Sequence, residues 1–141
     1  MFTHPEIWSF ASKWYRLLDI HAPIDSYKKL LTDDVELVFP EASLSGFSGY
    51  SEWYKNVINL FFDERHTLKV ADIINIDKDE CELHVVVNWH ASVWTPPASH
   101  SSRLKMDADQ TWKVRRLSNS DLAVSKYIVN ELIYEEGSCK L

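Results

Sequence analysis

One polar side chain with hydrogen-bonding chemistry lies in an otherwise apolar row of the sequence. Alternate residues of segment 101–116 are apolar, and Gln110 falls in that row between Ala108 and Trp112. Alternate residues of a strand share one face, so the row predicts an amide on the buried face of a sheet. Because buried polar groups are hydrogen-bonded, we expect the Gln110 amide either to bond to a neighbouring strand or to contact a ligand.

Aromatic side chains could build a flat, apolar wall around that amide. The chain carries 6 Trp, 6 Tyr and 6 Phe in 141 residues, a heavy aromatic load for a small domain. Indole and phenol rings combine apolar surface with N–H or O–H groups that orient a ligand. Simple core packing also explains aromatics at such spacing, and both interpretations stay open. The candidates for a ligand-binding wall are Trp53, Trp89, Trp112 and Tyr127.

The sequence has no pattern typical of a metal site, a phosphate-binding loop or a nucleophilic cysteine. No His-x-His, Cys-x-x-Cys or Glu-x-x-His spacing occurs, and His84 and His90 lie about 20 Å apart along one strand face. With 3 Gly in the chain there is no phosphate-cradling loop. Cys81 lies in an apolar row without a neighbouring base, which is typical of core filling. We therefore expect neither a metal nor a cofactor.

Composition narrows the classes of partner and location. The chain has 15 Lys and Arg against 21 Asp and Glu, so its formal net charge is −6. This balance lacks the positive surface that a phosphate backbone requires, and we expect no nucleic-acid partner. No run approaches the roughly 18–20 apolar residues of a membrane span, and residues 1–6 do not resemble a signal peptide. Cys81 and Cys139 are expected to be free thiols, which favours the cytoplasm.

These candidate residues depend on a predicted order of helices and strands in one domain over residues 1–141. The expected helices cover residues 4–21, 24–31 and 49–62, and the expected strands cover residues 35–39, 65–77, 81–94, 101–116 and 122–134. Residues 32–34 are expected to form a polar break between helix and strand. Residues 41–48 are expected to form a loop, and Ser48 or Gly49 is expected to cap the third helix. Helices before a run of strands indicate an α+β fold, a curved sheet around three helices. The row assignment places Trp89, Gln110 and Trp112 inside this cone.

Six short patterns spread over nearly the whole chain carry a family resemblance. They are Trp14-Tyr15, Val38-Phe39-Pro40, Gly46 and Gly49 before Trp53-Tyr54, residues 61–67, Val87-Asn88-Trp89, and residues 109–114. Together they resemble the nuclear transport factor 2-like superfamily and, within it, the SnoaL-like polyketide-cyclase group. The resemblance implies a cystatin-like cone, with three N-terminal helices packed in a curved, mostly antiparallel sheet. It leaves the chemistry open, because this scaffold hosts isomerases, dehydratases, cyclases, epoxide hydrolases and binding domains.

The resemblance implies two candidate catalytic residues, Tyr15 and His66, and the position of Glu41 in the sequence adds a third. Ketosteroid isomerases of this fold carry an Asp before the Pro that ends the first strand, where this chain has Phe39, so that chemistry is disfavoured. Tyr15 lies near the position of a hydrogen-bonding Tyr in those enzymes. Scytalone-dehydratase-like chemistry needs a His and an Asp with a Tyr-bound water, and His66 is the best His candidate. Glu41 follows Pro40 and could line the mouth of the cone as a base.

Each of these candidates has a simpler structural interpretation. Tyr15 could be a core residue with its hydroxyl at the wall, and Glu41 a solvated loop carboxylate. His66 could be a strand-end side chain hydrogen-bonded to Asp63 or Glu64.

An epoxide-hydrolase-like triad of Asp107, Asp109 and Arg116 is disfavoured. Both acids fall in the polar row with Lys105 and Lys113, where cross-strand charge pairing is the better explanation.

Taken together, these patterns favour a domain that binds a small, apolar or aromatic molecule in an aromatic-lined cone. Whether it is an enzyme stays open. One alternative is a cofactor-free lyase, isomerase or cyclase that acts through His66 and Tyr15. The other is a protein-interaction module that works as a dimer.

The outer row of segment 81–94 predicts self-association. It mixes Val86 with His84, Asn88 and His90, a composition that suits a two-fold interface better than a core or a free surface. The resemblance implies back-to-back pairing through this face. We expect a homodimer that buries these four residues; the alternative is a monomer with a solvated sheet face.

Overall fold

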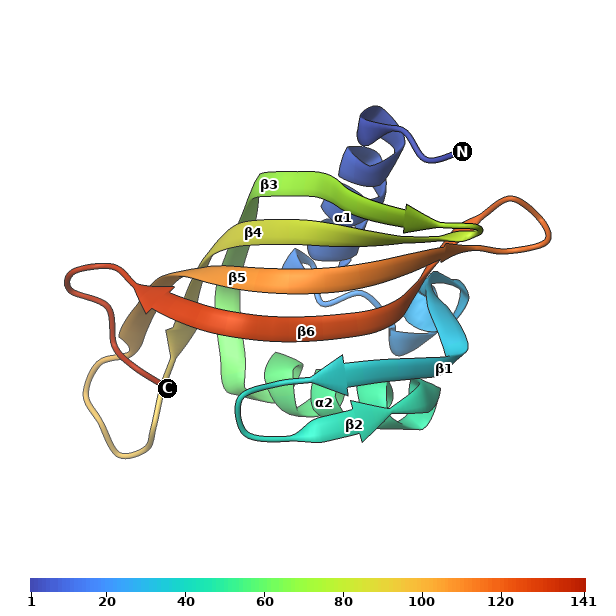
Figure 1. The fold of residues 1–141 in the computed structure, drawn as a ribbon. Coiled ribbons are helices and arrows are strands. Elements are labelled where there is room, and N and C mark those ends of the chain that lie inside the picture. Colours follow the sequence, from blue (N-terminus) through green and yellow to red (C-terminus); the bar gives the residue numbers. More distant parts are fainter.

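Six strands form one curved sheet around the helices in the computed structural model, which describes residues 1–141 (Figure 1). The helices are α1 (His4–Asp19), the 3-10 helix η1 (Ile24–Leu30) and α2 (Gly46–Leu60). The strands are β1 (Leu31–Val38), β2 (Ser43–Ser45), β3 (Phe61–Asp77), β4 (Glu80–Val93), β5 (Ser102–Arg116) and β6 (Leu122–Tyr134). The strand order is β2-β1-β6-β5-β4-β3.

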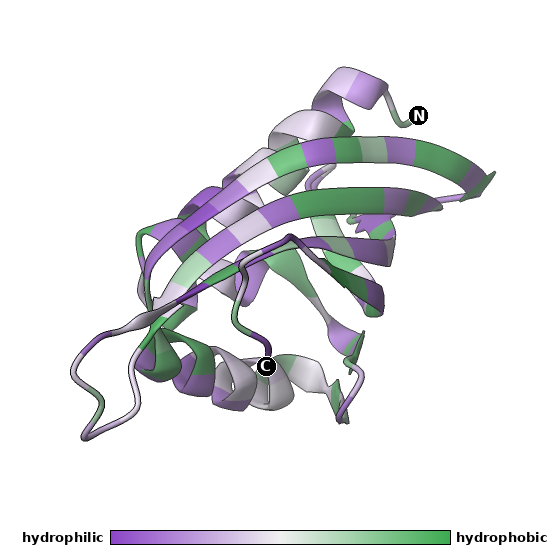
Figure 2. Ribbon diagram, turned by 90° about the vertical axis from the view of Figure 1, so that its left-hand side faces the viewer, coloured by the Kyte–Doolittle hydropathy of each residue, from purple (hydrophilic) through white to green (hydrophobic).

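Pairing in the sheet is antiparallel except between β1 and β6, which run parallel. A crossover by helix α2 and the long strands brings β6 back beside β1 (Figure 1). Figure 2 shows the long strands bending across the helices, with hydrophilic and hydrophobic residues alternating along them. The predicted α+β class and the curved, mostly antiparallel sheet are confirmed.

Helix α1 forms where its caps and its apolar spacing predict it. The Thr3 hydroxyl accepts a hydrogen bond from the Glu6 backbone N–H at 3.3 Å, and a proline occupies the first turn. The helix ends at Asp19, two residues earlier than expected, because His21 adopts a φ of 49° in the left-handed region. Asp19 therefore lies at the carboxyl end of α1.

Several further boundaries differ from the prediction. Strand β1 starts at Leu31, so residues 32–34 belong to the strand; an irregularity in its register against β6 accommodates them. Residues 43–45 form β2 because Leu44 pairs with Leu37 on the edge of the sheet, and α2 begins directly at Gly46 after the N-cap Ser45, not after Ser48 or Gly49. Residues 61 and 62 leave the helix because they pair with β4.

Alternate residues of the long strands face the core, as their period of two predicts. The inward row of β4 and β5 contains Cys81, Leu83, Val85, Val87, Leu104, Met106, Ala108, Gln110, Trp112 and Val114, all buried. Helix α2 buries Tyr50 and Tyr54, whereas its apolar residues Trp53, Val57 and Leu60 are only partly covered. None of the helices combines the length and apolar composition that a bilayer crossing needs.

The outer face of β4 and β5 pairs its charges within the chain. His84 Nε2 lies 3.0 Å from Asp109 Oδ2, and the Asn88 amide donates to Asp107 Oδ1 at 2.8 Å. His90 lies 3.1 Å from Glu135. These contacts leave a mixed surface around the partly covered Val86.

The homodimer through this face stays a prediction. Light scattering at micromolar concentration should give about twice the mass of the 16.5 kDa chain. Val86→Lys should shift the protein towards monomer, because it places a charge at the centre of the interface. Ile74→Lys, at an exposed position on β3, is the matched control. A wild-type mass of one chain would contradict the dimer.

Candidate active site

A cavity of about 620 Å³ lies between the inner face of the sheet and helices α1 and α2. Of its 21 lining residues, 15 are hydrophobic, so it suits an apolar guest. The α2 residues that turn away from the core line this cavity: Trp53, Asn56, Val57 and Leu60. No Lys or Arg lines it; its acidic lining residues are Glu41 and Glu64.

A histidine–carboxylate pair lies at the wall of the cavity. His66 Nδ1 lies 2.6 Å from Asp19 Oδ1, and the His66 backbone N–H donates to the same carboxylate at 3.0 and 3.2 Å. The side chains are 7% and 25% exposed, respectively. Because an ionised carboxylate only accepts, Nδ1 carries the proton, and Nε2 presents a lone pair without a partner in the chain.

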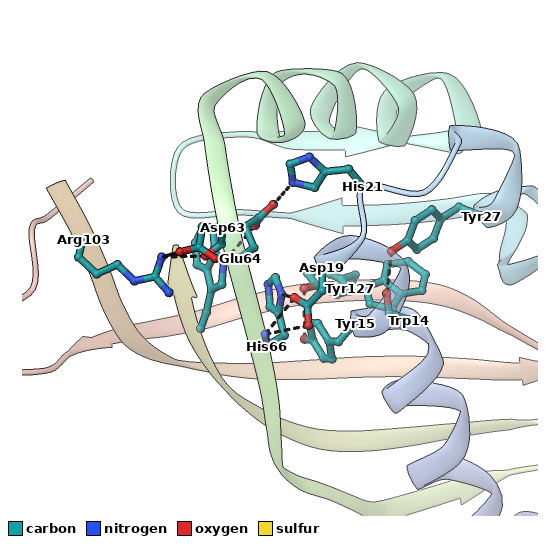
Figure 3. A network of polar contacts seen from close by, with 11 residues as sticks. Trp14, Tyr15, Asp19, His21, Tyr27, Asp63, Glu64, His66, Arg103 and Tyr127 are labelled. Atoms are coloured by element: carbon teal, nitrogen blue, oxygen red, sulfur yellow. Dashed lines mark hydrogen bonds and ion pairs between the residues drawn. The ribbon is translucent and has the colours of Figure 1, made fainter. Parts of the chain in front are cut away.

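Two aromatic rings hold the His66 imidazole in place. Its centroid lies 5.0 Å from that of Tyr15 and 5.5 Å from that of Trp89, with interplanar angles of 19° and 10°. The imidazole is thus stacked with a ring from α1 and a ring from β4. Figure 3 shows His66 on β3 next to Tyr15, with Asp19 reaching the imidazole from the end of α1. The ring orientation is fixed by packing as well as by the carboxylate.

A hydrogen-bonded group of neutral side chains lies beside the imidazole. The Gln110 amide donates to the Tyr15 hydroxyl at 2.8 Å, and the Trp112 N–H donates to Gln110 Oε1 at 3.0 Å. Burial raises the pKa of Tyr127 to about 12 and raises the pKa of Tyr15 well above its usual range. Both phenols are therefore neutral near pH 7, so they act as hydrogen-bonding groups and not as bases.

Seven of the eight predicted site residues line the cavity. They are Tyr15, Glu41, Trp53, His66, Trp89, Gln110 and Tyr127. Glu41 lies in the exposed loop after β1, and Phe39, in the position of the isomerase base, stacks on Trp53 at 4.9 Å. Whether these residues bind or transform a ligand stays a prediction at this point.

Trp112 requires a correction, because it does not line the cavity. It is fully buried, and its N–H is already bonded to Gln110. Trp14 of α1 and Tyr127 of β6 cover its ring, at centroid distances of 5.5 and 5.2 Å. Trp112 thus holds the Gln110 side chain through this hydrogen bond and is not part of the cavity wall.

Sequence reasoning missed the partner of His66. The expected partners were Asp63 and Glu64, but the carboxylate comes from Asp19, 47 residues away at the end of α1. One signal could have revealed it. An acid in the last turn of a helix is disfavoured by the helix dipole, so Asp19 calls for a compensating partner.

A second histidine–carboxylate pair was also missed. The Glu64 side chain is 1% exposed, accepts a hydrogen bond from the Trp89 N–H at 3.1 Å, and contacts His21 Nε2. The chain contains no group of three or more His, Cys, Asp or Glu side chains that could hold a metal ion.

Gln110→Leu should destabilise the protein by about 1–3 kcal/mol, because it leaves the buried Trp112 N–H without an acceptor. Urea unfolding measures the change. Lys113→Gln on the same strand, whose side chain makes no hydrogen bond or ion pair, should shift stability by no more than about 0.5 kcal/mol. An unchanged urea midpoint for Gln110→Leu would contradict the proposed hydrogen-bond arrangement.

Comparison with known proteins identifies the fold. No protein-family profile and no curated protein matches the chain. Among solved structures, hexachlorocyclohexane dehydrochlorinase LinA-type3 from Novosphingobium barchaimii LL02 superposes with a TM-score of 0.75 at 16% identity, over 97% of this chain and 92% of that chain. A candidate scytalone dehydratase from Novosphingobium aromaticivorans DSM 12444 gives 0.72 at 12% identity, over 96% and 94%.

A third similar structure names the fold itself. A Nostoc punctiforme protein of unknown function with a cystatin-like fold superposes with a TM-score of 0.71 at 16% identity, over 95% of this chain and 92% of that chain. The cystatin-like fold that the sequence resemblance implies is confirmed. The chain therefore has the cystatin-like α+β fold.

Proposed function

We propose that the protein is a cofactor-free lyase or isomerase that removes a proton from carbon in a small, uncharged, largely apolar molecule. The observation that carries this proposal is the His66–Asp19 pair, which presents the free Nε2 of a fixed imidazole at the wall of an apolar cavity. Two structures with the same fold are described as a dehydrochlorinase and a candidate dehydratase. Both names denote elimination reactions.

His66 is the general base in this proposal. Its Nε2 lone pair takes a proton from the substrate carbon, and the ring becomes an imidazolium. The Asp19 carboxylate stabilises that cation through the Nδ1–H hydrogen bond, and this effect is stronger in the cavity than in water because the local dielectric is lower. The stacked rings keep Nε2 in position, so little reorganisation accompanies the transfer.

Neutral hydrogen-bonding groups next to the base suit a carbonyl or hydroxyl on the substrate. The Tyr15 hydroxyl and the Gln110 amide both line the cavity, and the raised pKa of Tyr15 keeps it a donor. Donors of this kind stabilise negative charge that develops on an oxygen during proton removal. Trp53, stacked on Phe39, offers a flat surface for an aromatic or cyclic ring.

The charged residues of the cavity lining favour an uncharged substrate. The lining contains two acidic residues, Glu41 and Glu64, and no Lys or Arg. A substrate carboxylate or phosphate would therefore have no positive charge to pair with.

A domain that only binds such a molecule is the second candidate. The predominantly hydrophobic lining favours it, and the experiments below separate the two functions. With both cysteines free, the cytoplasm remains the location we propose.

His66 can be tested with 5-nitrobenzisoxazole, a flat, uncharged carbon acid. A base takes its C3 proton, the ring N–O bond breaks, and a coloured cyanonitrophenolate forms. His66→Gln should lower the turnover of this probe by ~100-fold, because the base is lost. His90→Gln, on the outer sheet face, is the matched control.

Quenching of tryptophan fluorescence, with Trp53 and Trp89 in the wall, reports whether the probe binds. Turnover that is equal in His66→Gln and wild type would contradict the role of His66. Binding without any turnover would make the protein a binding domain.

Asp19 is a positioning residue, and its effect should follow from the imidazole tautomer. Asp19→Asn offers an N–H donor as well as an acceptor, so the proton no longer has to reside on Nδ1. We expect a ~10- to 100-fold lower kcat for the nitro probe with little change in KM. Nitrogen-15 NMR of His66 should show the Nδ1–H form in the wild type and its loss in the variant. Asp25→Asn, an exposed acid in η1, is the control; an unchanged tautomer and kcat in Asp19→Asn would overturn this role.

A further inference from the structure

The His21–Glu64 pair connects the cavity with a second hollow on the surface. Glu64 lines the cavity, while His21 lines a hollow formed with Ser51, Tyr54 and Lys55. The His21 side chain is 28% exposed and the Glu64 side chain 1%. A continuous contact therefore leads from solvent through an imidazole to a carboxylate at the cavity wall (Figure 3).

The backbone is bent at both members of this pair. His21 and Asp63, the residue before Glu64, each have a φ of 49°, which is uncommon for residues other than glycine. The β3–β4 register shifts between Phe62 and Arg65, as in a β-bulge. Bulges re-aim side chains and occur next to active sites, and here the bulge accompanies a Glu64 that faces inward.

Hydrophobic packing does not explain why position 64 carries a glutamate. A buried carboxylate is costly even when it is hydrogen-bonded, and apolar residues of similar size fill such a site at least as well. Glu64 is nevertheless held by two donors, the Trp89 N–H and His21. Each carboxylate oxygen has a second lone pair, so the group can still carry a proton towards the cavity.

The acid also lies close to the base. Glu64 and His66 belong to the same strand, two residues apart, and Trp89 touches both: its ring stacks on His66 and its N–H bonds to Glu64. A substrate lying against Trp89 would meet both groups.

We propose that His21 and Glu64 form a proton relay that protonates the leaving group while His66 takes the proton from carbon. His21, as the imidazolium, passes a proton to Glu64, Glu64 gives it to the departing oxygen, and the neutral His21 regains a proton from solvent in the surface hollow. The C–H electron pair becomes the new double bond, the C–O electron pair becomes a lone pair of the leaving water, and the His66 imidazolium releases its proton to solvent after the products leave, so atoms and charge balance. This inference rests on the proposed function and narrows the substrate to one with a poor oxygen leaving group, such as a hydroxyl.

The test compares two probes that differ in their need for an acid. The phenolate released from 5-nitrobenzisoxazole is stable without a proton, whereas that from 1,2-benzisoxazole is more basic and gains from protonation. Glu64→Gln keeps an acceptor for the Trp89 N–H but cannot transfer a proton. We expect it to slow the unsubstituted probe by ~10-fold or more and the nitro probe by at most ~2-fold.

His21→Gln should give the same selective loss, because it interrupts the relay at its outer end. It also replaces Glu64→Gln as the deciding variant if near-UV circular dichroism shows that the latter is misfolded. Glu52→Gln, an exposed acid on α2, should change neither rate and serves as the matched control.

Equal slowing of both probes would mean that Glu64 only positions Trp89, and no slowing would mean that it is inert; either result overturns the relay alone. A wild-type protein that accelerates neither probe would contradict the proposed function together with the relay.

Discussion

The hydrogen bonds between Asp19 and His66 join the end of the first helix to the first long strand, and the other groups of the site depend on them. The carboxylate binds both the ring and the backbone N–H of His66, so it fixes the strand as well as the side chain. The fixed ring stacks with Tyr15 and Trp89, and Tyr15 in turn bonds to Gln110. A hydrogen bond to a charged group contributes about 1.5–3 kcal/mol, against about 0.5–1.5 kcal/mol for one aromatic contact.

The aromatic residues separate into a core set and a cavity set. Trp14 touches Tyr27, Tyr50 and Trp112 with centroid distances from 4.9 to 5.5 Å, and the Tyr27 hydroxyl donates to the Trp14 carbonyl at 2.6 Å. This aromatic packing lies on the core side of the residues that line the cavity. Tyr15 and Tyr127 belong to the buried core and also line the cavity, so the core packing and the cavity wall share these two rings.

The sequence predicted the fold better than the site, and the reason is physical. Alternating apolar residues predicted β6 at residues 122–134, where the structure has it, because period two is a local signal. The start of β1 was missed because the charged residues 33 and 34 do not look like part of a strand. They belong to β1 because its register against β6 shifts between Leu31 and Glu36. Asp19 and Glu64 were missed because partners 47 and 43 residues apart are chosen by tertiary packing, which no local spacing reports.

Trp53 and Val57 of helix α2 pack against the hydrophobic core and also line the cavity, where they are only partly covered. A guest molecule that covered them would therefore couple the stability of the protein to its binding. A guest that binds the folded chain alone adds about 2.7 kcal/mol to its stability at a hundred times Kd. That is a sizeable part of the ~5–15 kcal/mol by which domains are stable. A molecule bound in the cavity would complete the apolar packing between α2 and the sheet, and its concentration would then change the free energy of unfolding.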